Sequence, residues 1–240
     1  MSFLAIDIGA SSGRHMLGER VNGKIVLTEV YRFKNGPKMK NGHLCWDGKQ
    51  LFSDIIAGMK KCGEMGITPE SVAIDCFGVD FVLLDENDCL IGDTVSYRDE
   101  RTLKVKDEVF GIINEDGLFA RTGIAYQPFN TIFQLYAVKK ESPEDMKRAK
   151  SFLMLPEYFN FLLTGVKMNE FTNASTTQLV NVKTREYDSE LLSMLGIPSD
   201  LFGKLHMPSE VVGELLPEIQ KLVGYNCKVV LAASHDTGSA

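Results

Sequence analysis

Three short segments of this chain share one construction: an apolar run, an acid at or near its end, and a glycine close behind. They are residues 5–9 (AIDIG), 73–78 (AIDCFG) and 233–238 (ASHDTG). Short apolar runs stopped by glycine are typical of buried strands. Ligands of α/β proteins bind in the crevice beyond the carboxyl ends of such strands. The repeated construction therefore predicts an α/β fold in which the three acids form one negatively charged site.

The first part of the chain predicts antiparallel strands. Residues 3–8 read as a buried strand, and residues 15–18 and 25–33 read as the next two. Asn22 and Gly23 form a dipeptide that strongly favours a two-residue hairpin turn. We therefore expect a three-stranded meander at the start of the sheet.

Helical patterns follow the meander. A helix is predicted to begin after Asp47, with Gln50 as its capping-box partner, and to end by Gly66. Residues 100–150 are predicted to be mostly helical, and residues 228–233 are predicted to form a late strand. Alternation of this kind predicts an α/β domain with a mixed β-sheet flanked by helices.

Composition and charge exclude several classes of protein. The net charge of the 240 residues is -6 and no long basic run occurs, which argues against nucleic acid or an anionic membrane as partner. No apolar stretch approaches the ~20 residues of a membrane span. The five cysteines form no C-x-x-C pair, and the four histidines complete no zinc spacing. We expect reduced thiols in a cytoplasmic protein.

The loop after the first strand is rich in glycine and serine, which favours phosphate binding. Small residues let backbone N–H groups point at an anion, and an arginine adds a bidentate positive group. The residues assigned to this loop are Ala10, Ser11, Ser12, Gly13 and Arg14. Asp7, just before it, is assigned to Mg²⁺ through water. The loop matches neither the Walker pattern nor G-x-G-x-x-G, and an ordinary tight turn with a solvated arginine is the alternative.

Asp236 is the candidate general base. It follows a predicted strand and stands where a helix begins, so the positive helix end is expected to keep its carboxylate ionised. An ionised acid there can accept the proton of a substrate hydroxyl during phosphoryl transfer. The alternative is a simple helix N-cap.

Four further residues carry weaker signals. Gly78 and Asp80 are expected to line a polyol pocket, and a plain β-turn acid is the alternative for Asp80. Arg98 belongs either to that pocket or to a local cluster of salt bridges. His235 is expected to donate to a hydroxyl, unless it is a packed core histidine.

Several of these stretches together resemble the FGGY family of carbohydrate kinases. They are "AIDIGASSGR", "WD" before a helix, "SVAIDCFGVDFVLLD", "YRDERT", "PFNTIFQLYA", "LMLPEYFNFLLTG", "EFTNASTTQLVN" and "AASHDTGSA", and they run in order along the chain. The resemblance implies actin-like domains of ribonuclease-H fold with a cleft between them. "GASSGR", "GVDFVLLD" and "SHDT" resemble the members that transfer the γ-phosphoryl group of ATP to the 1-hydroxyl of L-rhamnulose.

The resemblance also implies site residues. It assigns the loop from Ala10 to Arg14 to the phosphates, and Asp7 to the associated Mg²⁺. It assigns Gly78 to the sugar. His235, Asp236 and Thr237 match the sugar-binding "HDT", with Asp236 as the general base; Asp80 and Arg98 are added as sugar contacts from the residues themselves.

The resemblance further implies that residues 1–240 are the N-terminal, sugar-binding domain of a longer protein. A C-terminal domain that holds adenosine would follow, and the 240-residue chain alone is expected to be inactive, since phosphoryl transfer needs positioning from both sides of the cleft. Two alternatives stay open. One is a kinase of the same family for another ketose or polyol, and the other is a non-catalytic actin-like module.

Overall fold

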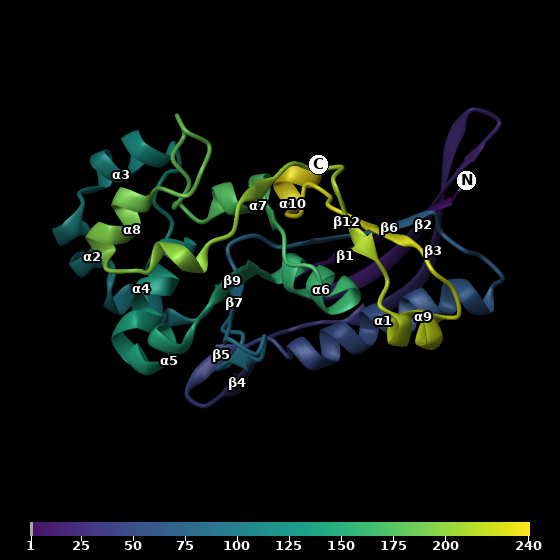
Figure 1. The fold of residues 1–240 in the computed structure, drawn as a ribbon, viewed down its shortest axis with the longest axis horizontal. Helices are drawn as coiled ribbons and strands as arrows, with labels where there is room; N and C mark the ends of the chain where they lie inside the picture. Colours follow the sequence, from purple (N-terminus) through teal and green to yellow (C-terminus); the bar gives the residue numbers. More distant parts are fainter. Residues whose placement is uncertain (1) are drawn as a thin grey trace.

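A computed structural model describes residues 2–240 (Figure 1). Within them the main sheet has six strands in the order β12-β13-β6-β1-β2-β3. These strands are β1 (Ser2–Ile8), β2 (Ser12–Val21), β3 (Lys24–Lys34), β6 (Ser71–Cys76), β12 (Val211–Glu214) and β13 (Lys228–Val230). β1, β2 and β3 are antiparallel, whereas β1, β6 and β13 run parallel. The predicted meander and mixed sheet are both present.

The hairpin between β2 and β3 turns at Asn22 and Gly23, as the sequence predicts. Both residues have a positive φ, 51° and 80°, which is the backbone that a two-residue hairpin turn requires. The late strand is shorter than predicted, because β13 ends at Val230 and residues 231–234 continue as a loop. That loop carries the chain to the candidate base.

β1 is buried on one face only, which differs from the fully buried strand that its apolar run predicts. Leu4, Ile6 and Ile8 are buried, whereas Phe3 and Ala5 are exposed. Successive side chains of a strand point to opposite faces of the sheet. The acid that ends the run therefore lies on the open face, and its neighbours anchor the strand in the core.

Three helices cover the packed face of the sheet. They are α1 (Gly48–Glu64), α6 (Leu155–Thr164) and α9 (Pro217–Val223). α1 begins as predicted, since the Asp47 carboxylate accepts a hydrogen bond from the backbone N–H of Gln50 at 3.0 Å. Its apolar stripe, including Leu51, Ile55 and Met59, joins the strand residues in one hydrophobic core.

A second hydrophobic core lies at the other end of the molecule, away from the β2–β3 hairpin (Figure 1). It contains a small sheet in the order β8-β7-β9 and a group of helices. The elements are β7 (Phe81–Leu84), β8 (Leu90–Ile91), β9 (Ser151–Met154), α2 (Lys106–Ile112), α3 (Glu115–Thr122), α4 (Thr131–Glu141), α5 (Pro143–Arg148) and α8 (Ser189–Leu195). Phe133 of α4 and Phe152 of β9 are fully buried there.

The remaining elements are short and join these two parts. They are β4 (Lys38–Lys40), β5 (His43–Cys45), the 3-10 helices Glu100–Lys104 and Ser199–Leu201, β10 (Asn169–Glu170), α7 (Phe171–Thr176), β11 (Leu205–His206) and α10 (Asp236–Ser239). All five cysteines are free thiols. Among residues 2–240, no helix has both the length and the apolar character of a membrane-spanning segment.

Candidate active site

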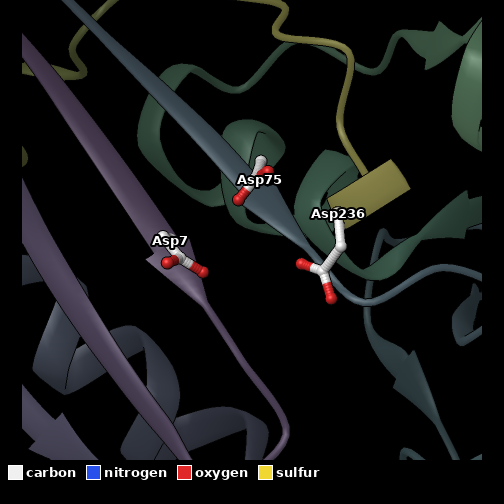
Figure 2. A group of neighbouring side chains, drawn as sticks. All are labelled: Asp7, Asp75 and Asp236. Carbon is white, nitrogen blue, oxygen red and sulfur yellow. The ribbon is translucent and has the colours of Figure 1, made fainter. Parts of the chain in front are cut away.

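Asp7 and Asp75 stand side by side at the ends of two neighbouring parallel strands (Figure 2). They are direct partners in the register of β1 and β6, so their side chains share the open face of the sheet. On the other side, Asp7 is the register partner of Arg14 in β2, and the Arg14 Nε donates to Asp7 Oδ2 at 2.8 Å. The alternating pattern of the strands therefore brings two acids and one arginine to one edge.

Asp236 completes the group from a distant part of the chain. The segment before it lies beside the end of β6, because Cys76 pairs with His235 and the Cys76 N–H donates to the Ser234 carbonyl oxygen at 3.3 Å. One carboxylate oxygen from each of Asp7, Asp75 and Asp236 lies within 4.8 Å of the others (Figure 2). The three strand-end segments of the sequence thus meet at one site.

Burial and neighbouring negative charge make two of these acids, Asp75 and Asp236, weaker than usual. Burial, with Asp7 and Asp236 as neighbouring negative charges, raises the pKa of Asp75 to about 6. Burial first, and then Asp7, raises the pKa of Asp236 above its ordinary value. The helix end that is expected to favour the ionised carboxylate of Asp236 has a small effect, because α10 has only four residues, and burial and the Asp7 charge act in the opposite direction.

The predicted phosphate loop is a tight turn followed by a strand. The Gly9 N–H donates to the Ser12 carbonyl oxygen at 3.0 Å, so Ala10 and Ser11 form the tip of the turn. Ser12, Gly13 and Arg14 already belong to β2.

The glycine at position 13 has a packing reason, because a Cβ there would overlap the ring of Phe33. Within the turn itself, Gly9 and Ala10 are the residues with little or no side chain, so their backbone is the most accessible to a ligand.

Asn35 holds this turn, although no sequence pattern singles it out. Its side-chain amide donates to the Gly9 carbonyl oxygen at 2.9 Å, and its backbone N–H donates to the Ser11 carbonyl oxygen at 3.0 Å. Asn35 follows β3, so the meander itself brings it back to the start of β2. No local signal reveals such a contact across 26 residues.

The loop after β6 carries Gly78 and, next to it, an unusual backbone conformation at Val79. Val79 has a φ of 67°, which is rare for a β-branched residue and is found mainly at functional sites. Its N–H donates to Thr176 Oγ1 at 3.1 Å, and its carbonyl oxygen accepts from Thr131 Oγ1 at 2.6 Å. Gly78 is half-buried beside the Thr176 side chain.

Asp80 is expected from the sequence to line a polyol pocket, but it lies in the interior. Its side chain has no exposed surface and accepts hydrogen bonds from Trp46 Nε1 at 2.6 Å, Tyr97 N at 3.1 Å and Gln134 Nε2 at 3.1 Å. Burial raises its pKa to about 6. The structure places Asp80 behind the Gly78 loop, where it fixes the residues around it.

Aromatic side chains surround the residue before Gly78. Phe77 stacks on Trp46 with ring centroids 4.4 Å apart and also contacts Tyr97 at 5.7 Å. Arg98 is exposed, and its Nε donates to the Tyr97 hydroxyl at 3.2 Å. Arg98 therefore reaches the site region only through the hydroxyl of Tyr97. The alternative prediction, a local cluster of salt bridges around Arg98, is not seen among the described residues.

His235 and Thr237 flank the candidate base. His235 is half-buried, and burial lowers its pKa, so the imidazole is neutral at pH 7. Thr237 is exposed in the first turn of α10. A Cβ at Gly238 would lie 2.8 Å from His235 Nε2, so the glycine in "HDTG" leaves room for the histidine ring.

The three carboxylates fit a divalent cation. Mg²⁺ prefers hard oxygen ligands and binds through one or two carboxylates, with water and substrate phosphates completing its shell. Asp7 and Asp75 offer two carboxylates in register, and the turn at Ala10 and Ser11 follows directly after β1. The arrangement can hold a metal–phosphate complex beside a third carboxylate, Asp236.

The model of the FGGY family of carbohydrate kinases, N-terminal domain, matches residues 2–240. The chain belongs to this family. Among curated FGGY proteins, rhamnulokinase of Halalkalibacterium halodurans is 54% identical over 99% of this chain and 50% of its own length. Rhamnulokinase of Oceanobacillus iheyensis is 49% identical over the same shares. The chain spans about half the length of the curated relatives that it matches.

Solved FGGY structures share the fold. Xylulose kinase from Lactobacillus acidophilus superposes with a TM-score of 0.87 at 22% identity, over 98% of this chain and 48% of that one. Glycerol kinase from Plasmodium falciparum, solved with ADP, gives a TM-score of 0.83 at 14% identity, over 98% and 48%. The predicted α/β fold, a mixed sheet flanked by helices in an actin-like domain, is confirmed.

Proposed function

We propose that this chain is the sugar-binding part of an ATP-dependent kinase that phosphorylates the 1-hydroxyl of L-rhamnulose, a step in L-rhamnose catabolism. The observation that carries the proposal is the meeting of Asp7, Asp75 and Asp236 beside the turn after β1. The identity of up to 54% to proteins named rhamnulokinase supports the choice of sugar.

Asp7 and Asp75 are the residues that would hold Mg²⁺. The cation, when bound with ATP, neutralises charge on the phosphate oxygens during transfer. The turn at Ala10 and Ser11, followed by Ser12 and Gly13, faces the terminal phosphates. Arg14 holds Asp7 in place through their ion pair at 2.8 Å and adds positive charge at the same edge.

Asp236 takes the proton of the sugar hydroxyl. As the hydroxyl oxygen bonds to the γ-phosphorus and the bond from that phosphorus to the bridging oxygen of ADP breaks, the proton passes to the Asp236 carboxylate. The raised pKa of Asp236 suits this role, because a stronger base accepts the proton more readily.

The sugar itself lies between two loops. Gly78 presents backbone next to the site, and the neutral His235 and the hydroxyl of Thr237 offer hydrogen bonds to sugar hydroxyls. Asp80 and Arg98 do not contact the sugar and act on the site through Tyr97. Asp80 fixes the backbone of Tyr97, and Arg98 holds the hydroxyl of that same tyrosine.

We further propose that residues 1–240 are an N-terminal domain and that a C-terminal domain supplies the adenosine site. The chain covers about half the length of the curated rhamnulokinases that it matches, which supports this division. A cytoplasmic setting, with ATP and small-molecule sugar as partners, fits the five free thiols.

A kinase assay on the full-length protein tests the function. L-rhamnulose, D-xylulose, D-gluconate and glycerol are each offered with Mg²⁺-ATP, and ADP release and product are measured. We expect L-rhamnulose 1-phosphate to form with the highest kcat/KM. Asp236→Asn should lower kcat by roughly 10²–10⁴-fold, the usual contribution of a general base.

The matched control is Asp200→Asn, an exposed acid in the 3-10 helix Ser199–Leu201, which should leave kcat unchanged. Preference for another sugar of the panel would replace the substrate assignment. Full activity of Asp236→Asn would refute the assigned base.

A further inference from the structure

The short helix α7 lies between the two loops to which the proposed function assigns sugar binding and proton transfer. Figure 1 shows α7 next to α10, the helix that begins with Asp236. We call Glu170–Thr176, which is α7 together with its N-cap residue, the α7 segment. Each end of it is bonded to a different loop.

The first end holds the loop before Asp236. Glu170 is fully buried, and its Oε2 accepts from both the backbone N–H and the hydroxyl of Ser234, at 3.2 and 3.1 Å. The same carboxylate caps α7 by accepting from Thr172 N at 2.7 Å and Asn173 N at 2.9 Å. One buried acid thus ties the start of the helix to the chain two residues before the base.

The carbonyl group of Ser234 is held as well. Its oxygen accepts from Asn173 Nδ2 at 3.2 Å and from Cys76 N at 3.3 Å. Every hydrogen-bonding group of Ser234 therefore has a partner in α7, its cap or β6. Ser234 itself has no exposed surface, so it cannot contact the sugar.

The other end holds the Gly78 loop. Thr176 Oγ1 accepts from Val79 N at 3.1 Å and donates to the Asn173 carbonyl oxygen at 2.7 Å. Val79 keeps its φ of 67° under this contact. A conformation that is costly for a β-branched residue persists only where its surroundings determine it.

We propose that the α7 segment sets the separation between the sugar-binding Gly78 loop and the general base Asp236, with Glu170 and Thr176 as its two positioning residues. This rests on the proposed function. Glu170 acts on Asp236 through Ser234, and Thr176 acts on Gly78 through Val79. The two ends therefore control different kinetic parameters.

Glu170→Gln tests the end near the base, in the full-length protein with L-rhamnulose. The amide puts an NH₂ group against N–H and O–H donors, so Ser234 loses a partner and Asp236 moves relative to the hydroxyl. We expect kcat to fall by roughly 10–100-fold, since small misplacements of reacting groups have effects of this size. The KM for the sugar should rise by no more than about fivefold, because the Gly78 loop is untouched and only the contacts of His235 and Thr237 shift with Asp236.

Thr176→Val tests the end near the sugar. It keeps the shape of the side chain but removes the acceptor of Val79 N. We expect the KM for the sugar to rise by roughly 5–20-fold with kcat within about twofold. Thr176→Ser keeps the oxygen and should restore the wild-type KM. Ser175→Ala is the matched control, because Ser175 Oγ donates to the Thr172 carbonyl oxygen inside α7 and contacts neither loop.

Thermal unfolding of each variant accompanies the kinetics, and Ser234→Ala replaces Glu170→Gln if the latter does not fold. The proposal is overturned if Glu170→Gln raises the KM as much as Thr176→Val does and Thr176→Val lowers kcat as much as Glu170→Gln does, or if neither variant changes either parameter. Failure of the proposed function is distinct, since the wild-type protein would then not phosphorylate L-rhamnulose. In that case the same comparison is made with the sugar of the panel that the wild type does phosphorylate, and the same outcomes decide it.

Discussion

The Asp80 carboxylate has no exposed surface, and its hydrogen bonds hold neighbours of the sugar loop in place. Trp46→Phe would remove the 2.6 Å bond to Asp80 while keeping an aromatic ring against Phe77. We expect the free energy of unfolding to fall by about 1–3 kcal/mol, because a buried charged acceptor loses a donor. Urea unfolding followed by circular dichroism measures this change. Tryptophan fluorescence cannot be used, because Trp46 is the only tryptophan and the variant lacks it.

Asp80→Asn in the Trp46→Phe background is the control for this assignment. The neutral amide no longer needs a strong donor, so the second change should cost less in the double variant than it does alone. Equal costs in both backgrounds would show that the bond between Trp46 and Asp80 does not carry the effect.

His15 gives the stability of the protein a dependence on pH. It is fully buried in β2, its Nε2 is 3.1 Å from the Ile55 carbonyl oxygen, and burial lowers its pKa to about 4. The unfolded chain takes up the proton near pH 6.5, whereas the folded chain resists until about pH 4. The free energy of unfolding should therefore fall as the pH drops across this window, by roughly 3 kcal/mol in total.

The measurement is urea unfolding at several pH values between 7 and 4. His15→Leu should flatten the slope across the window, even where it changes the stability at pH 7. A slope that stays the same in His15→Leu would assign the dependence to other groups. Asp75 and Glu157 act in the opposite direction. Burial raises their pKa values, so their contribution to the free energy of unfolding falls as the pH rises.

Sequence patterns found the acids of the site but not the residues that hold them. Asp7, Asp75 and Asp236 carry a local signal, because each stands at or near a strand end followed by glycine. Glu170 and Asn35 carry none, since their partners lie 64 and 26 residues away along the chain. Asp80 is predicted as a sugar contact, with a turn acid as the alternative, because a sequence cannot tell which way a loop side chain points.

At the scale of elements, α1 packs against β2 through a glycine. A Cβ at Gly58 would overlap the His15 ring. Alanine is the better helix former by roughly 1 kcal/mol, but overpacking a core costs about 1–3 kcal/mol. We expect Gly58→Ala to lower the melting temperature, and His15→Ala in the same chain to recover part of the loss.

Gly111→Ala in α2 is the matched control, because nothing lies within 4 Å of a Cβ at that position. There the helix propensity acts alone, so the melting temperature should rise slightly. An equal response of both glycine variants would mean that the His15 ring moves freely and that the contact does not constrain α1.

Elements with strong local signals were predicted well, and short ones were not. The cap at Asp47 and the hairpin at Asn22 and Gly23 fixed α1 and the meander from nearby residues alone. The predicted late strand, residues 228–233, is longer than the observed β13. Residues 231–233 remain apolar after the pairing with β6 ends, so the sequence shows no boundary there. The burial of Leu231 comes from tertiary packing, which periodicity does not record.

At the scale of the whole molecule, the candidate site lies where two hydrophobic cores meet. Cys76 at the end of β6 belongs to the first core, and Phe81 at the start of β7 belongs to the second. The Gly78 loop joins them directly. A sugar bound to this loop and to His235 would thus contact the connection between the cores rather than one core alone.

Hydrogen exchange of the 240-residue chain tests this placement. A ligand that binds only the folded state stabilises it by about 2.7 kcal/mol at a hundredfold excess over its Kd, which slows by roughly 100-fold the amides that exchange through unfolding of the unit that holds the ligand. Because the loop between β6 and β7 spans both cores, saturating L-rhamnulose should slow exchange in β1 and in α4 by the same factor. His235→Ala, which removes a proposed sugar contact, should abolish both effects together. Slowing confined to α4 would place the sugar inside the second core and away from Asp7, and slowing confined to β1 would detach the Gly78 loop from sugar binding.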